Sequence, residues 1–424
     1  MPFAAAVSEH PVTAHAAGEV AGQLLDQLGG ERPDLLTIFV TRPHLGALED
    51  VAATLDTLLS PAHLMGATAV SVVAGDREVE EAAAVVAWAG TRMGPLRTLH
   101  LRAHRGPFGR EGADARAILG WPSREAIDFV PQALLLLADP YSFPVDTLLT
   151  HLERTWPGLP VIGGMASAAY GPGGNRLAGG DTLDGTRISA EGAVGVLVGP
   201  GVDLHPVVSQ GCRPVGQPFV VTRASGNHVQ ELGGRSAMQR LLDLAEGELT
   251  EREIQIINQG GLHLGVVIDE HKVEFGTGDF LVRNVLGADQ ETGSIEVSDR
   301  VEVGTTVQYH VRDAIAADQD LRELLSGQHG HGALVFTCNG RGKRLFGTPH
   351  HDAALVAEVL GAGLSPGGVP SLSPALAGLF AAGEIGPIGR RNFVHGFTAS
   401  IALFSDRNPD GQQVVARAAP PPTP

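Results

Sequence analysis

Residues 133–165 read ALLLLADPYSFPVDTLLTHLERTWPGLPVIGGM, and this stretch decides the fold class of the chain. It opens with Ala133–Ala138, an uninterrupted apolar run that is typical of a buried strand. Leucines on one helical face then predict a helix over Val145–Trp156. A second apolar strand, Val161–Met165, follows it. The order of strand, helix and strand is typical of a sheet that carries helices.

The same order of elements returns twice, which indicates an old internal duplication. The central unit closes with a predicted strand at Gly192–Val198. Near the N-terminus we predict a strand at Leu35–Val40, a helix over Leu48–Leu59, and strands at Ala67–Ala74 and Ala82–Ala89. Near the C-terminus we predict a strand at Ala333–Thr337, a helix from its Thr348-Pro349 cap to Leu360, a strand at Leu379–Ala382, a glycine loop at Gly383–Gly389 and a strand at Gly396–Leu403. Because the spacing drifts between units, the chain is not a solenoid.

A stretch rich in predicted strands separates the second unit from the third, with one helix at Ser236–Leu244. We therefore expect an α/β (mixed α+β) fold in two lobes. In this fold, duplicated strand-helix-strand-strand units form mixed β-sheets that are flanked by helices. The break between the lobes is expected near residues 205–230.

The charge and the cysteines of the chain limit its partners and its location. The 424 residues carry 30 lysines and arginines against 47 acidic residues, a formal net charge of −17. Nucleic acid and anionic membranes would repel this charge, so neither is an expected partner. No apolar run approaches the ~20 residues that a membrane span needs. Two cysteines make no disulfide framework, and Met1–His10 is not a signal peptide, so we expect a cytoplasmic protein.

The first candidate site is the string Cys338-Asn339-Gly340-Arg341-Gly342, which directly follows a predicted buried strand. The glycines on either side of Arg341 leave backbone N–H groups bare, and a guanidinium beside them suits a carboxylate or another anion. Ligands of open α/β sheets bind outside the carboxyl ends of the strands, where this string falls. The alternative is a tight turn in which Arg341 packs on a neighbouring loop.

The second candidate site is formed by Gly383, Glu384 and His395. The Glu384 carboxylate ends a strand with small neighbours, so it could face a cavity and complement an ammonium group. Together with Arg341 it would then clamp both ends of an amino-acid-like ligand. The alternative is that Glu384 forms a structural ion pair with a nearby arginine. We expect His395 to be a hydrogen-bonded loop histidine and not a base.

Residues of the third unit also raise two other chemistries, metal binding and nucleophilic catalysis. The string His350-His351-Asp352 is not expected to bind a metal, because adjacent helical residues point about 100° apart. Asp352 is better explained by the helix dipole. Nucleophilic catalysis would need Cys338 activated by a base, for which His395 is the candidate, but the sequence offers no orienting group. A cysteine-dependent hydrolase or transferase is therefore an alternative function, and no cofactor is expected.

Eight short strings, taken together and in order, resemble the FIST family of sensory domains over residues 33–404. They are Val161–Ser167, Glu191–Gly195, Gly211–Gly216, Gly278–Asn284, Val307–Asp313, Cys338–Gly342, Gly383–Pro387 and His395–Thr398. The resemblance implies a FIST N-terminal domain at 33–225 and a FIST C-terminal domain at 226–404. Residues 1–32 would be an N-terminal extension with a short helix, and residues 405–424 a disordered tail.

The resemblance also implies a small-ligand sensor for signal transduction, with an amino acid or a small carboxylate as the suggested ligand. Because the match leaves little chain for an output domain, we expect a standalone sensor that acts through a protein partner or a homo-oligomer. The pocket is expected between the two C-terminal strings, as a charged, solvent-accessible hollow to which Arg213 or Arg312 contributes. A non-catalytic adaptor is the third alternative.

Overall fold

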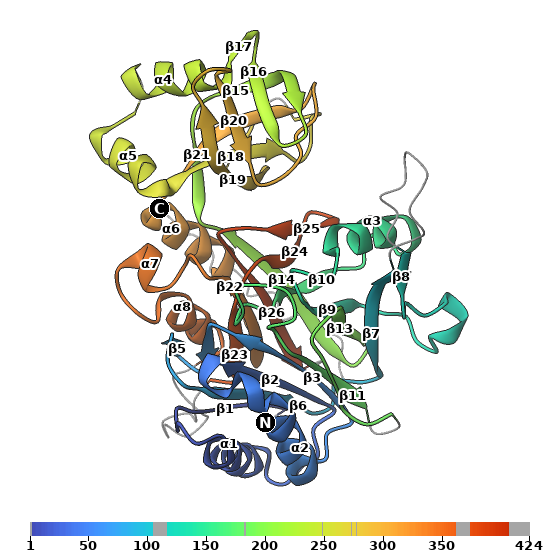
Figure 1. Cartoon of the computed structure of the whole chain (residues 1–424). Coiled ribbons are helices and arrows are strands. Elements are labelled where there is room, and N and C mark those ends of the chain that lie inside the picture. Colours follow the sequence, from blue (N-terminus) through green and yellow to red (C-terminus); the bar gives the residue numbers. More distant parts are fainter. Residues whose placement is uncertain are drawn as a thin grey trace, which may run out of the picture.

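The computed structural model describes residues 2–104, 117–181, 184–247, 249–272, 274–276, 278–361 and 374–406. Its strands form three sheets that make up the body of the molecule and a fourth that makes up an inserted lobe (Figure 1). The mixed α+β fold, with helix-flanked mixed sheets in two lobes, is thereby confirmed. Among the described helices, none is long and apolar enough to cross a membrane.

Each sheet of the body is built around one repeat of the predicted unit. The first repeat has β2 (Leu35–Thr41), α2 (Leu48–Leu59), β3 (His63–Ala69) and β6 (Val85–Gly90). The second has β9 (Ala133–Ala138), α3 (Val145–Thr155), β10 (Val161–Met165) and β13 (Ala193–Val198), and the third has β22 (Gly332–Cys338), α8 (His351–Val359), β23 (Leu376–Ala381) and β26 (Thr398–Asp406). In every repeat the first two strands pair in parallel, and the last strand pairs antiparallel with the first.

Each repeat also places a hairpin in the sheet of another repeat. The hairpins are β4 (Ser71–Ala74) with β5 (Arg77–Glu80), β11 (Leu177–Asp181) with β12 (Arg187–Ser189), and β24 (Glu384–Ile388) with β25 (Arg391–His395). They extend the third, the first and the second sheet, by pairing with β23, β3 and β10. Because this exchange is cyclic, each sheet of the body contains strands from two repeats.

The sheets are completed by edge strands that precede the repeats in the chain. These are β1 (Phe3–Ser8), β7 (Leu96–His104) and β14 (Val202–Gln210), which pair with β6, β13 and β26, while β8 (Ala117–Leu119) extends the second sheet beyond β7. Residues 3–28 of the predicted N-terminal extension thus form β1 and α1 (Thr13–Leu28) and belong to the first sheet and its cover. Most of the predicted tail, residues 407–424, lies outside the described residues.

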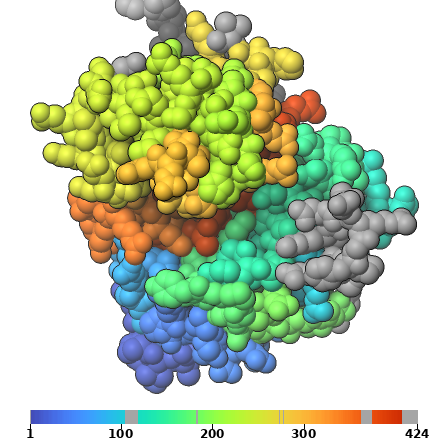
Figure 2. Space-filling view, turned by 45° about the horizontal axis from the view of Figure 1, so that its top comes forward, coloured from blue at the N-terminus to red at the C-terminus, as the bar shows by residue number. Residues whose placement is uncertain are grey.

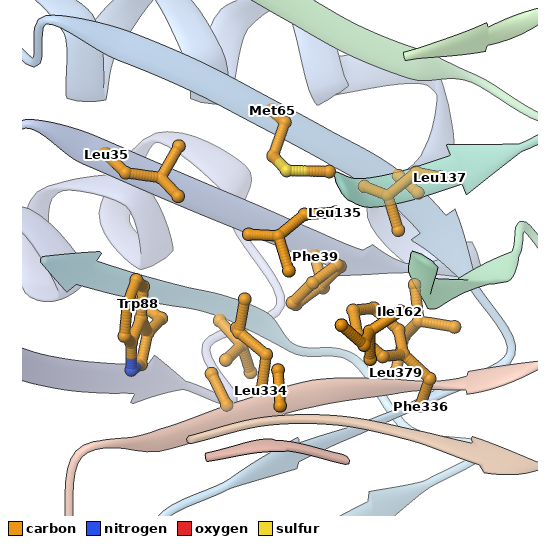
Figure 3. Close-up of a cluster of buried hydrophobic side chains, with 14 of the residues drawn as sticks. Leu35, Phe39, Met65, Trp88, Leu135, Leu137, Ile162, Leu334, Phe336 and Leu379 are labelled. Atoms are coloured by element: carbon orange, nitrogen blue, oxygen red, sulfur yellow. The ribbon is translucent and has the colours of Figure 1, made fainter. Parts of the chain in front are cut away.

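An apolar core fills the space between the three sheets of the body. Figure 3 shows part of it, with Phe39 of the first sheet, Leu135 of the second and Phe336 of the third near one another. The outer faces are covered by α1 and α2 on the first sheet, by α3 on the second, and by α6 (Ala314–Leu325) and α8 on the third. Burial on both faces explains why the central strands are nearly continuous apolar runs.

A glycine recurs at one register position of all three repeats. Gly66, Gly163 and Gly378 stand opposite Ile38, Leu136 and Val335 in the parallel strand pairs. A Cβ at any of the three glycines would lie less than 3.0 Å from the carbonyl oxygen of that partner. The glycines therefore permit a close approach of the strands that any side chain would prevent. They also show that the three repeats share one structural plan.

Two sequence-based predictions about strands are wrong. The apolar run at Ala67–Ala74 contains two strands, β3 and β4, which belong to different sheets. The predicted glycine loop at Gly383–Gly389 contains strand β24, because its residues pair with β10 on one side and with β25 on the other. Pro387 is compatible with this strand, since the pairing with β10 involves only Glu384 and Ile385.

The predicted start of the last helix is also wrong. Helix α8 begins at His351 and not at the Thr348-Pro349 cap. The Glu78 carboxylate of the first repeat accepts hydrogen bonds from the N–H groups of His350 and Asp352, at 2.9 and 3.0 Å. A side chain from a distant part of the chain thus serves as the cap, which local sequence does not reveal.

The lobe is inserted between β14 and α6, ahead of the first strand of the third repeat. Its sheet contains β15 (Cys212–Ser225), β16 (His228–Leu232), β17 (Arg235–Ser236), β18 (Leu262–Val267), β19 (Phe280–Asp289), β20 (Ser294–Val297) and β21 (Thr306–Arg312). With α4 (Ala237–Gly247) and α5 (Glu251–Ile256), these strands enclose an apolar core of their own. Figure 2 shows the lobe, largely in yellow-green, seated on the body. The chain enters and leaves it at Gly211 and Asp313, where the Asp313 N–H donates to the Gly211 carbonyl at 3.2 Å.

Candidate functional site

The two candidate strings of the third repeat lie next to each other in the fold. The string 338–342 follows β22, and Gly383 and Glu384 follow the neighbouring strand β23. The Asn339 N–H donates to the Ala381 carbonyl at 3.0 Å, which joins the two strand ends. The chain turns sharply at Gly342, whose φ of +59° lies in the left-handed region that favours glycine. The structure therefore brings the strings together, as the sequence predicts.

Arg341 is held in the interior by an ion pair. Its side chain is 1% exposed, and its Nε and Nη2 atoms donate to the Asp352 carboxylate at 2.7 and 2.8 Å. Burial alone would raise the pKa of Asp352, but the charge and hydrogen bonds of Arg341 outweigh it and hold that pKa well below its usual range. Asp352 is thus the partner of Arg341 and not merely a charge on a helix dipole.

The predicted guanidinium fork for a ligand is therefore only partly available. Asp352 takes two nitrogens of Arg341, while the third, Nη1, is buried without a hydrogen-bond partner among the described residues. The Nη1 atom lies beside the neck of the lobe, since a Cβ at Gly211 would stand 3.3 Å from it. Arg341 can consequently offer one donor to a ligand while its charge stays balanced by Asp352.

Glu384 is the second buried ionisable residue of the site. Its side chain is 0% exposed, and its Oε2 atom accepts hydrogen bonds from the Thr398 N–H at 3.1 Å and the Thr398 hydroxyl at 2.8 Å. No well-aligned hydrogen bond reaches its Oε1 atom within the described parts of the chain, where the Cys338 thiol is the neighbouring group that interacts with the carboxyl group. Burial raises the pKa of Glu384 to about 8. The two hydrogen bonds from Thr398 hold this carboxylate in place, so the alternative of a structural ion pair does not explain its position.

The internal repeats show that a carboxylate is exceptional at this position. Glu384 stands opposite Gly164, one residue beyond the recurrent glycine of β10. The residues at the same place in the other two hairpins are Leu177 and Val72, and both are fully buried apolar side chains of the central core. Packing alone is thus satisfied by an apolar residue here. Glu384 costs desolvation free energy that Leu177 and Val72 do not, which points to a role other than packing.

The structure differs from the predicted hollow in the solvent exposure of its two charged side chains. Arg341 and Glu384 interact electrostatically with each other and with the Cys338 thiol, so we call Cys338, Arg341 and Glu384 the buried polar cluster. The two charged side chains are closed off from solvent, and the expectation that they line a solvent-accessible hollow is wrong. Thr398 of β26 contacts Glu384, and Gly211 at the neck of the lobe lies beside Arg341.

A cleft of about 330 Å³ lies directly outside the buried polar cluster, between the body and the lobe. Gly383 and His395, two of the predicted site residues, line it from the body. The His395 ring is 5% exposed and its Nε2 atom hydrogen-bonds the Gly386 carbonyl at 3.0 Å. Burial lowers the pKa of His395 to about 4, so the ring is neutral near pH 7.

The lobe contributes charged and polar groups to the other wall of the cleft. Arg283 and Asp299 form an ion pair there, with 2.9 Å between Nε and Oδ2, and Asn284 lies beside them. Asp146, from the first turn of α3, faces the same space from the body. The cleft therefore presents both signs of charge within a volume suited to a small molecule.

The two remaining predicted arginines lie at the neck of the lobe. Arg213 forms ion pairs with Asp313, at 2.9 Å, and with Glu253. Two carboxylates of the chain itself therefore already pair with its guanidinium group. Arg312 donates from Nη2 to the Gly340 carbonyl, and its guanidinium carbon lies 5.8 Å from the centre of the Phe397 ring. Burial lowers the pKa of Arg312. Arg312 thus links the lobe to the string 338–342, whereas Arg213 anchors the lobe to α6.

The thiols of the chain are poorly suited to nucleophilic attack. Burial, and next the negative charge of Glu384, raise the pKa of Cys338 to about 12. Burial also raises the pKa of Cys212 far above its usual range. His395 uses its Nε2 atom on a backbone carbonyl and is not positioned by any described contact to take a proton from Cys338. Within the described residues, no group of His, Cys, Asp or Glu side chains could hold a metal ion.

Two residues near the site carried no signal that sequence reasoning could use. His263, on β18 of the lobe, is 1% exposed, and its ring interacts with the side chain of Asn284, its cross-strand neighbour on β19. It stands in an ordinary apolar strand pattern. Phe397 is part of the string His395–Thr398, but only its φ of +64° distinguishes it, and that is visible only in the structure. The His263 and Phe397 rings lie 4.2 Å apart.

Comparison with known proteins places the chain in a family. The family model of the FIST N domain matches residues 34–235, and that of the FIST C domain matches residues 236–387. The boundary between the two matches falls inside the inserted lobe, within the short strand β17. The division into two sequence domains therefore does not follow the three structural repeats.

The full length of the chain resembles two sets of mycobacterial proteins. "Uncharacterized protein Mb0898c" of Mycobacterium bovis is 43% identical over 414 residues, which covers 96% of this chain and 99% of that protein. "Uncharacterized protein Rv0628c" of Mycobacterium tuberculosis is 41% identical over 413 residues, covering 96% of this chain and 100% of that protein. Together with the two domain matches, these likenesses show that the chain belongs to the FIST family, whose domains bind small ligands in sensing and signal transduction.

Proposed function

We propose that the ligand of this sensor is an amino acid or another small carboxylate, bound at the junction of the lobe and the body. One observation carries the proposal: among the described residues, two buried ionisable side chains each keep one atom without a hydrogen-bond partner, Oε1 of Glu384 and Nη1 of Arg341. Buried polar atoms are nearly always hydrogen-bonded in folded proteins. A ligand with a donor at one end and an acceptor at the other would satisfy both.

The pKa of Glu384 supports an ammonium group as the donor. At a pKa of about 8 the carboxyl group is largely protonated near pH 7. An ammonium group placed at Oε1 would favour the charged carboxylate, so binding would release a proton from Glu384. Ligand affinity should therefore rise with pH until Glu384 is ionised without the ligand.

The cleft supports the proposal as the place where a ligand arrives. Its volume of about 330 Å³ is at the lower end of ligand pockets, which suits a small metabolite. Gly383 and His395, which line the cleft, also flank Glu384, the first as its chain neighbour and the second as its cross-strand partner. A ligand that binds there would touch the lobe and the body together. Binding would therefore favour one arrangement of the lobe relative to the body over other arrangements. Such a shift between arrangements is what a signal requires.

We further propose that the chain acts as a binding protein in the cytoplasm and not as an enzyme. The high pKa of Cys338 leaves little thiolate for nucleophilic attack. Both cysteines are free thiols, as is usual in a reducing compartment. The output would pass to a protein partner or to a second copy of the chain through the position of the lobe.

A thermal unfolding screen tests the ligand class. The twenty L-amino acids and a set of small mono- and dicarboxylates are added to the full chain, and binding is quantified for each compound that stabilises it. A ligand at 100 times its Kd should stabilise the fold by ~2.7 kcal/mol. We expect Glu384→Gln to weaken binding at least about ten-fold, because a neutral amide does not attract an ammonium group.

The matched control is Glu153→Gln. Glu153 is an exposed residue of α3 that pairs with Arg391 at 2.9 Å, away from the buried polar cluster. This variant should bind the ligand as the wild type does. The proposal fails if no compound in either class stabilises the wild type, or if Glu384→Gln binds a stabilising compound with unchanged affinity.

A further inference from the structure

Phe397 stands between the cleft and the buried polar cluster. Its side chain lines the cleft. On the inner side, a Cβ at Gly340 would lie 3.4 Å from the Phe397 ring, so the ring packs directly on the string that contains Cys338 and Arg341. The next residue, Thr398, donates its N–H and hydroxyl hydrogens to Glu384. Phe397 therefore lies beside a path from the cleft toward Glu384.

The lobe supplies the surface on which the ring rests. The His263 ring of β18 lies 4.2 Å from the Phe397 ring, and the Arg312 guanidinium of β21 lies 5.8 Å from it. Arg312 also donates to the Gly340 carbonyl, so the same arginine contacts both the ring and the string behind it. Two contacts from the lobe thus define the position of the Phe397 ring, and a third joins the lobe to the string behind the ring.

The backbone of Phe397 is in a conformation that bulky L residues rarely adopt. Its φ is +64°, in the left-handed region that favours glycine. The Phe397 carbonyl also faces the neck, where a Cβ at Gly211 would lie less than 3.0 Å from it. Such a conformation persists only where its surroundings hold it, and here the surroundings are the lobe and its neck.

We propose that Phe397 is the gate and the size-determining residue of the buried ligand site, and that the lobe holds it closed through His263 and Arg312. The inference rests on the proposed ligand site and adds how that site is entered. Entry requires the ring to leave its place between His263 and Gly340. Because the ring is seated on the lobe, a ligand that displaces it also changes the contact between the lobe and the body.

Thiol labelling of Cys338 tests the gate without any ligand. Cys212→Ser leaves Cys338 as the single thiol of the chain. Its reaction rates are measured with a small reagent, methyl methanethiosulfonate, and with a bulky aromatic one, DTNB. In Phe397→Ala we expect the DTNB rate to rise at least about ten-fold and the rate of the small reagent to rise much less, since a gate limits the larger molecule more. Phe397→Leu should give a smaller effect in the same direction.

The control and a second variant separate a gate from a general loosening of the fold. Phe393 is a half-buried phenylalanine of β25, four residues before Phe397, and Phe393→Ala should leave both rates unchanged. His263→Ala removes part of the seat from the lobe and should raise the DTNB rate. The proposal is overturned if Phe397→Ala leaves the DTNB rate at the wild-type value, or if it raises both rates equally, which would indicate unfolding. Neither result bears on whether a ligand binds, so the gate and the ligand site can fail separately.

Discussion

Replacing Glu384 with glutamine should remove a pH dependence of stability that the wild-type chain owes to this one carboxyl group. The pKa of Glu384 is about 8 in the folded chain and 4.5 for an unperturbed glutamate. Between those values the folded chain keeps a proton that the unfolded chain has released. The carboxyl group therefore stabilises the fold fully below the lower value, and this stabilisation is lost as the pH rises through the higher one.

The magnitude follows from the size of the shift. One pKa unit corresponds to about 1.4 kcal/mol, so the whole shift amounts to at most ~5 kcal/mol. Between about pH 5 and pH 7.5 the free energy of unfolding of the wild type should fall by about 1.4 kcal/mol per pH unit relative to Glu384→Gln. All other titrating groups are common to both proteins and cancel in the difference. The glutamine oxygen can still accept the hydrogen bonds from Thr398.

Urea unfolding measures this difference at several pH values. Tryptophan fluorescence is a suitable probe, because Trp88 is fully buried in the central core of the body. Glu153→Gln serves as the control and should run parallel to the wild type at every pH, since its exposed pair with Arg391 is solvated. Parallel curves for the wild type and Glu384→Gln would refute the reasoning, because they would mean that burial does not perturb this carboxyl group.

Three further outcomes follow from the same structure. Arg341→Leu should destabilise the fold by ~3–5 kcal/mol in urea unfolding, because it leaves the Asp352 carboxylate buried and unpaired, and adding Asp352→Leu should recover much of the loss; equal losses in the single and double variants would contradict this. Gly378→Ala should prevent folding or cost more than ~3 kcal/mol, because its Cβ would overlap a strand carbonyl, whereas Gly18→Ala in open space on α1 should stabilise by ~0.5–1 kcal/mol; a Gly378→Ala variant as stable as the wild type would contradict this. At pH 7, with a pKa of about 12 against an ordinary 9.0, Cys338 should be alkylated by iodoacetamide about 1,000-fold more slowly than free cysteine, and a rate near that of free cysteine would show an exposed thiolate.

The repeated unit could be predicted from the sequence because each of its strands is buried on both faces. Ala133–Ala138 and Val161–Met165 have the predicted bounds as β9 and β10, and the predicted helix between them is α3. Continuous apolar runs and one-sided helices are local signals. They identify the elements of a repeat without any knowledge of its partners.

The exchange of hairpins could not be predicted, because pairing between repeats is a tertiary property. The run at 67–74 is apolar throughout, yet β3 ends at Ala69 and β4 begins at Ser71 in another sheet. β24 has the glycine and proline content of a loop, and it is a strand because β10 and β25 pair with it. The composition of a segment limits which secondary structures it can adopt, whereas the strands that pair with it determine which one it adopts.

The same limit applies to the site. The strings that contain Arg341 and Glu384 were recognisable because glycines and charged residues follow apolar strands. Their partners were not recognisable, since Asp352 lies on a helix face and Thr398 at the start of a strand. His263 comes from the lobe, which lies elsewhere in the sequence and meets the body only in the folded chain.

A crystal structure of the chain with a stabilising amino acid from the screen tests the central claim most directly. The account predicts density for the ligand between the lobe and the body, with a donor within hydrogen-bond distance of Oε1 of Glu384 and an acceptor within reach of Nη1 of Arg341. Ligand density elsewhere on the molecule, with the Glu384 and Arg341 side chains unchanged and bound only to water, would contradict it.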